Sequence, residues 1–106
     1  MKAYVISGVA VRDAEPLVEL RKDSARIVKS YKGKVLAAGK PCEWIESIDD
    51  DSRPERIGII EFPSLDAARR YVQSVEFQEL TARRNKYADA FIIVVEGIDD
   101  PADYGR

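Results

Sequence analysis

Two segments near the ends of the chain, KAYVISGVAV at residues 2–11 and AFIIVVE at residues 90–96, constrain the fold most strongly. Both have the length and β-branched composition of strands, and both carry apolar residues on each of their two alternating faces. Helices that pack on one face of a sheet leave the other face to be covered by something else. Exposing that face would leave several Val and Ile side chains in water, at a cost of about 1.5–3 kcal/mol each. The sequence therefore predicts a homodimer in which a second copy covers the open face of the sheet.

The residues between these two segments predict helices and two further strands. We expect a helix that Asp13 caps and Gly33 closes, and then two helical segments that Ser64 and Ser74 cap. The remaining strand patterns lie at residues 34–38, resuming at 43–46, and at residues 56–62. A polar loop is expected at residues 49–54.

The predicted order of elements is β-α-β-β-α-β, the ferredoxin-like or split βαβ arrangement of an α+β sandwich. Right-handed crossovers give a four-stranded antiparallel sheet with the strand order 4-1-3-2. We expect one ferredoxin-like domain at residues 1–97 and a polar C-terminal tail at residues 98–106.

The composition excludes several classes of function. The chain has no histidine and a single cysteine, which excludes Ser-His-Asp and Cys-His catalysis and the usual zinc and haem sites. We therefore expect no metal and no cofactor. The formal net charge of −2 gives no basic footprint for nucleic acid. The longest apolar run is too short for a membrane helix and the N-terminus lacks a secretory layout, so a cytoplasmic location without membrane partners is expected.

Several short segments together resemble one known family. The matching residues are 4–6, 56–64, 74–78, 84 and 94–97. They resemble the family called domain of unknown function 1330, from about residue 3 to residue 97, whereas the segment around Cys42 and Trp44 is not a close match. The resemblance implies a dimeric α/β barrel, in which two ferredoxin-like sheets meet across a dimer. That superfamily includes small monooxygenases, haem-degrading enzymes and lactone isomerases, so the fold does not choose the activity.

Two polar residues at one end of the predicted sheet are candidates for catalysis. The strand order places Glu61 and Glu96 at the same end, with Tyr4 between them. A partly buried carboxylate beside a tyrosine could accept a proton from a carbon next to a carbonyl group. Alternatively, both glutamates simply end their strands at the surface. We predict Glu61 and Tyr4 as the catalytic residues and keep the structural alternative open.

Arginines gather at the opposite end of the sheet. Arg56 begins the third strand, Arg84 lies near the end of the second helical region, and Arg12 follows the first strand. Converging guanidinium groups would bind a carboxylate or a phosphate. The alternative is a structural role in ion pairs with nearby carboxylates, for which the candidates are Glu15, Glu79 and Asp89.

Aromatic and small residues complete the candidate site. Phe77 and Trp44, with Tyr31 and Tyr87, either line an apolar pocket or belong to the core. Ser7 and Gly8, in the middle of the first strand, are expected to leave room for a ligand or for a second backbone.

The sequence thus predicts a cofactor-independent isomerase, lyase or monooxygenase-like enzyme that acts on a small anionic or phenolic compound. Arg84 and Arg56 would orient the substrate, and Glu61 or Tyr4 would transfer a proton. The alternative is a non-catalytic small-molecule-binding or accessory dimer, and the sequence leaves the choice between enzyme and binder open.

Overall fold

A computed structural model describes residues 1–49, 51 and 53–105 of the chain. Asp50 and Ser52 of the expected polar loop, and the last residue, Arg106, lie outside the described residues. The elements are β1 (Ala3–Val11), α1 (Glu15–Ser30), β2 (Lys34–Ala37), β3 (Arg56–Phe62), α2 (Leu65–Gln73), α3 (Val75–Arg84), β4 (Ala88–Glu96) and a short 3-10 helix, η1 (Pro101–Asp103).

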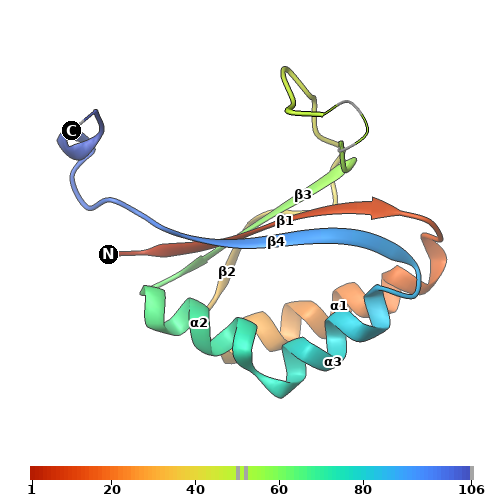
Figure 1. The fold of residues 1–106 in the computed structure, drawn as a ribbon. Coiled ribbons are helices and arrows are strands. Elements are labelled where there is room, and N and C mark those ends of the chain that lie inside the picture. Colours follow the sequence, from red (N-terminus) through yellow and green to blue (C-terminus); the bar gives the residue numbers. More distant parts are fainter. Residues whose placement is uncertain (50, 52, 106) are drawn as a thin grey trace.

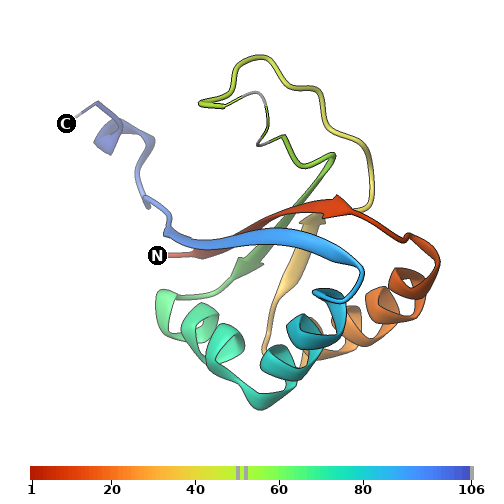
Figure 2. The same cartoon turned by 45° about the vertical axis from the view of Figure 1, so that its right-hand side comes forward.

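The four strands form one sheet in the order β2-β3-β1-β4, and every neighbouring pair is antiparallel. This arrangement confirms the ferredoxin-like fold and the strand order 4-1-3-2. All three α-helices lie against one face of the sheet (Figure 1). The segment between β2 and β3 and the C-terminal tail rise on the other side (Figure 2).

The register assigns each side chain to one of the two faces. Along β1, Ala3 and Val5 are buried beneath the helices, so Tyr4 and Ile6 point to the open face. The main core lies on the helix-covered face, where Phe62 of β3 packs with Val28 of α1 and Tyr71 of α2.

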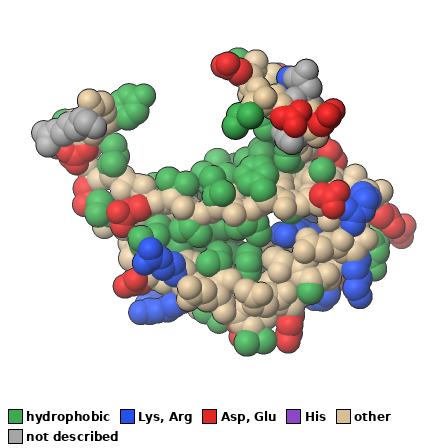
Figure 3. Space-filling view, in the orientation of Figure 1, with side chains coloured by type: hydrophobic (Ala, Val, Ile, Leu, Met, Phe, Trp, Pro, Cys, Tyr) green, Lys and Arg blue, Asp and Glu red, His purple; other side chains and the backbone are tan. Residues whose placement is uncertain are grey.

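The open face is apolar, and none of the described helices covers it (Figure 1). Ile59, Ile6 and Ile93 lie side by side across β3, β1 and β4. Phe91, Ile93 and Val95 of β4 keep 41–48% of their surface exposed. Figure 3 shows hydrophobic side chains gathered along the sheet between the two projecting segments.

Two serines begin the helices that follow β3, as the sequence predicts. The Ser64 hydroxyl accepts a hydrogen bond from the backbone N–H of Ala67 at 3.1 Å. Ser74 ends α2 and also begins α3, because its hydroxyl accepts from the N–H of Phe77 and donates to the carbonyl of Tyr71. These caps satisfy backbone groups that the helices leave unpaired.

Other local predictions are wrong. Ala14, not Asp13, occupies the N-cap position of α1, and no side chain caps it. At the end of α1 the left-handed residue is Lys32, with φ 67°. Gly33 is needed instead for space, since a Cβ there would lie 2.6 Å from Val28 and 2.9 Å from Phe62.

The boundaries of two strands also differ from the prediction. Residues 43–46 do not resume β2, and the bridge described beyond the break is the one between Pro41 and Arg56. The pairing of β2 with β3 is already irregular between Val35 and Ala37, so the register is lost before residue 43. β4 begins at Ala88, two residues before its apolar run.

Candidate functional site

A cavity of about 200 Å³ lies between the helices and the sheet. Its floor includes Gly58, Ser7 and Ile92, which face one another across β3, β1 and β4. Because Gly58 and Ser7 are small, the sheet surface is recessed here. On the open face, the neighbouring residues along the same strands form an isoleucine row of Ile59, Ile6 and Ile93. Figure 3 shows a hollow between the sheet and the helices, with hydrophobic and basic side chains inside it.

The charged groups that the described residues contribute to this cavity are all arginines. They are Arg21 from α1, Arg56 from β3 and Arg84 from α3. The other polar side chains in the lining are those of Ser7, Ser24 and Tyr71, and the remaining lining is glycine or apolar. The described lining therefore offers positive charge and hydrogen-bond donors but no carboxylate, thiol, amine or imidazole.

Arg84 is the most unusual of these groups. Its Nε is buried and has no hydrogen-bond partner, whereas its Nη2 donates to the side-chain oxygen of Asn85 at 3.3 Å. Burial lowers the pKa of Arg84 and the nearby Tyr71 acts in the opposite direction, but a guanidinium stays protonated in proteins. A buried donor without a partner costs about 1–3 kcal/mol. Arg84 therefore occupies the cavity wall at an energetic cost.

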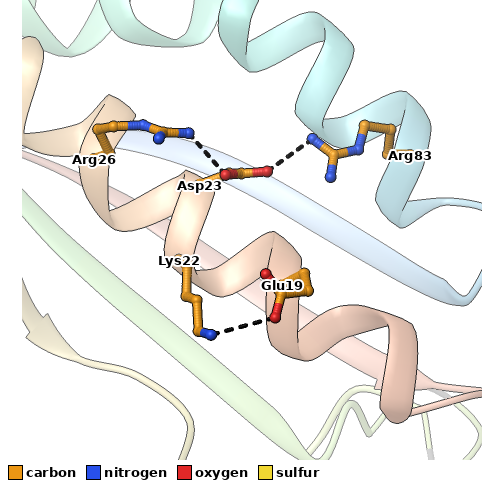
Figure 4. A network of polar contacts seen from close by, with 5 residues as sticks. All are labelled: Glu19, Lys22, Asp23, Arg26 and Arg83. Carbon is orange, nitrogen blue, oxygen red and sulfur yellow. Dashed lines mark hydrogen bonds and ion pairs between the residues drawn. The ribbon is translucent and has the colours of Figure 1, made fainter.

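Neighbouring arginines have partners that Arg84 lacks. Arg83, one residue earlier, pairs with Asp23 of α1 at 3.0 Å, and Asp23 also holds Arg26 (Figure 4). Arg12 pairs with Asp89 and donates to a backbone carbonyl. Arg12 therefore has the structural role in an ion pair that the sequence offered as the alternative to anion binding. Within the described part of the chain, neither Arg56 nor Arg84 forms an ion pair.

Tyr71 places a phenol beside Arg84 in the cavity wall. Burial raises the pKa of Tyr71, while a hydrogen bond with Ser24 and the charge of Arg84 act in the opposite direction. The ring is fixed by Phe62 and Phe77, whose centroids lie 5.2 and 4.9 Å away. Tyr71 is not among the site residues that the sequence predicts. Its hydroxyl group was the one sign of a role in the site, because a buried tyrosine O–H needs a hydrogen-bond partner.

The cavity brings together four of the residues that the sequence singled out: Arg84, Arg56, Ser7 and Phe77. Trp44 lies elsewhere, on the segment between β2 and β3. Its indole N–H donates to the carbonyl of Pro54 at 3.0 Å, and 37% of its surface is exposed. Its predicted contact with substrate remains a prediction.

The two predicted catalytic residues lie on the other face of the sheet. Tyr4 and Glu61 are directly opposite each other in the β1–β3 pair, so both side chains point to the open face. Glu61 also pairs with Lys2, whose Nζ lies 3.3 Å from Oε1. The structure thus separates Glu61 and Tyr4 from the cavity, and their catalytic role remains a prediction.

The described residues offer neither a metal site nor a membrane-spanning helix. They contain no group of three or more His, Cys, Asp or Glu side chains that could hold a metal ion. None of the described helices has the length and hydropathy needed to cross a lipid bilayer.

The fold is ferredoxin-like, and a cavity of about 200 Å³ lies between its helices and its sheet. The sequence profile of the family described as "Domain of unknown function (DUF1330)" matches residues 2–98. The chain therefore belongs to this family, which confirms the resemblance seen in the sequence. No curated protein matches the sequence.

Solved structures share the fold at low sequence identity. The protein RPA0582 of Rhodopseudomonas palustris, of unknown function, is 19% identical over 93% of this chain and 84% of its own, with a TM-score of 0.70. A dimeric ferredoxin-like protein of unknown function from Jannaschia sp. is 11% identical over 92% and 100%, with a TM-score of 0.61. SnoaB, a cofactor-independent oxygenase of Streptomyces nogalater, is 14% identical over 96% and 98%, with a TM-score of 0.55. At these identities the likeness is one of fold.

Proposed function

We propose that this protein binds a small anionic or phenolic compound in the cavity, with Arg84 and Arg56 holding its negatively charged oxygen. The observation that carries the proposal is the buried Nε of Arg84, which has no partner. A donor left unpaired at this cost is explained if a ligand supplies the acceptor. Arg56 and Arg21 add positive charge to the same cavity.

The size and lining of the cavity support a compound with one ring. An apolar protein cavity of about 150 Å³ can bind benzene, and this one has a volume of about 200 Å³. Phe77, Leu80 and Ile60 supply apolar walls for the ring. The ligand would thus combine a flat apolar body with one anionic group, which agrees with the general make-up of small-molecule sites.

We propose two uses for this site, from different classes. The first is cofactor-independent catalysis, which the fold shared with SnoaB, a cofactor-independent oxygenase, supports by analogy only. The second is binding without chemistry, as a carrier or accessory protein. The absence of a carboxylate, thiol, amine or imidazole from the described lining favours the second use, unless the substrate supplies its own base.

The proposed assembly is a homodimer through the open face of the sheet. Its support is the isoleucine row formed by Ile59, Ile6 and Ile93, which no described helix of the same chain covers. The Jannaschia protein of the same fold is described as dimeric. Face-to-face packing of two such sheets would bury both rows.

Calorimetric titration with benzoate tests the anion site. Arg84→Gln should weaken binding by about tenfold or more, because a charged hydrogen bond to a carboxylate contributes about 1.5–3 kcal/mol. Arg83→Gln is the matched control, since Arg83 lies on the same helix turn but pairs with Asp23. Equal affinities for wild type and Arg84→Gln, or no binding to wild type, would overturn the proposal.

A further inference from the structure

We propose that the cavity binds an acidic hydroxyl compound, a phenol or an enol, as its oxyanion, with Arg84 and Tyr71 both donating hydrogen bonds to that one oxygen. This inference rests on the proposed function and narrows the ligand to a chemical class. It adds Tyr71, which is not among the site residues predicted from the sequence, as a binding residue.

The groups around the cavity can donate protons in hydrogen bonds but cannot take one up. The titratable or charged groups facing it are Arg21 on α1, Tyr71 on α2, Arg84 on α3 and Arg56 on β3, and the described parts of β1 and β4 contribute none. Burial keeps Tyr71 in its neutral form at neutral pH, because it raises the pKa of the phenol. The site therefore favours a ligand oxygen that carries negative charge and no hydrogen.

Arg84 and Tyr71 line the same cavity, so one ligand oxygen can lie near both donors. One edge of the Arg84 guanidinium is engaged, since Nη2 donates to Asn85, and Nε–H is the buried group without a partner. The Tyr71 hydroxyl comes from a different helix and lies close enough for the charge of Arg84 to act on it. Its hydrogen bond with Ser24 lowers the pKa of Tyr71, as expected when Ser24 donates to the phenol oxygen, and this leaves the Tyr71 O–H free to donate to a ligand. One oxyanion can accept from both, because an oxygen with several lone pairs accepts more than one hydrogen bond.

The proton balance of this binding step is simple. The ligand O–H bond breaks, its electron pair stays on the ligand oxygen, and the proton goes to the solvent. No lining group can keep the proton, since Tyr71 is already protonated and the arginines are already charged. Binding should thus release a proton when the free ligand is neutral, and the bound ligand should ionise at lower pH than the free one.

The probe for this step is para-nitrophenol, whose ionised form absorbs visible light. A pH titration in the presence of saturating wild-type protein should show the pKa of the bound phenol lowered by about one unit or more, which is about a tenfold preference for the oxyanion. Tyr71→Phe, which removes one donor and keeps the ring, should reduce the shift. Arg84→Gln should abolish it, and Arg83→Gln should leave it unchanged.

Each outcome separates this inference from the proposed function. Bound para-nitrophenol with the pKa of the free compound, or a full shift retained in Tyr71→Phe, would overturn the inference. Benzoate binding that depends on Arg84 while para-nitrophenol fails to bind would also overturn it and would leave the anion site standing. Failure of both probes would remove both proposals. Thermal unfolding of each variant checks that it is folded.

Discussion

The two faces of the sheet differ most where they lie back to back. On the open face, Ile59, Ile6 and Ile93 form a continuous apolar row across three strands. One residue along each strand, on the helix-covered face, the row is Gly58, Ser7 and Ile92, and it lines a cavity. The open face is full and uncovered, whereas the covered face is left partly empty.

The two faces are therefore suited to different kinds of contact. A flat row of β-branched residues is suited to packing against another sheet, and it gains stability only when water is excluded. A hollow lined by unpaired arginine and small residues loses stability in the free protein and gains it when a ligand binds. These differences support the proposed dimer through the open face and the proposed ligand site on the covered face.

The largest expected effect is weaker dimerisation when a charge is placed on the open face. Ile93→Asp places a charge in the isoleucine row of both protomers, and each copy loses about 1.5–3 kcal/mol of apolar burial. The dimer should weaken by about a hundredfold or more. Sedimentation equilibrium of wild type and variant measures this change.

The control for that experiment is Val18→Asp. Val18 is 51% exposed on α1, away from the open face, so this variant should keep the wild-type association constant. A wild-type protein that stays monomeric at high concentration would contradict the proposed dimer through the open face.

A smaller effect of opposite sign is expected on the covered face. Arg84→Met should raise the free energy of unfolding by about 1–3 kcal/mol, because it removes a buried donor that has no partner. Arg83→Met removes only a surface ion pair and should change stability by less than about 1 kcal/mol. Urea unfolding at neutral pH measures both. A large loss of stability in Arg84→Met would instead make Arg84 a structural residue.

The smallest expected effect concerns a polar pair outside the cavity. The Tyr31 O–H donates to Oε2 of Glu76, and this hydrogen bond lowers the pKa of Glu76. The resulting stability is present above the ordinary pKa of a carboxyl group and is lost as the pH falls through the lowered value. Carboxyl NMR titration should show the pKa of Glu76 rising towards its ordinary value in Tyr31→Phe.

Tyr104→Phe is the control for this titration, because Tyr104 lies 88% exposed on the C-terminal tail. An unchanged Glu76 titration in Tyr31→Phe would mean that the hydrogen bond is not formed in solution. The carboxylate of Glu76 therefore has a hydrogen-bond donor within the chain, whereas the Nε–H of Arg84 has no acceptor.

The fold was predictable because its signals are local. The alternation in β1 identified both faces, and the serines at 64 and 74 marked two helix starts that the structure confirms. The wrong predictions concern positions whose structure depends on tertiary contacts. Gly33 is placed by its closeness to Val28 and Phe62, and the segment at residues 43–46 lost its strand pairing through an irregularity upstream.

The candidate site was predictable only in part. Arg84 and Arg56 were found because arginines at one sheet end suggest an anion site, and both line the cavity. Tyr71 was missed because its spacing on α2 is that of a core residue, and nothing local reveals that it meets α3. Glu61 and Tyr4 were placed at the correct end of the sheet, but their face follows from the residue-by-residue register.

The buried Nε–H of Arg84 has no hydrogen-bond acceptor, and we propose that a bound ligand supplies one. Arginine side-chain NMR tests this proposal most directly. The Nε–H signal of Arg84, assigned by its loss in Arg84→Gln, is followed while benzoate is added to the wild-type protein. We predict a saturable shift of this signal and a smaller one for Arg83, whose guanidinium already pairs with Asp23. A signal that does not move at saturating benzoate would contradict the account.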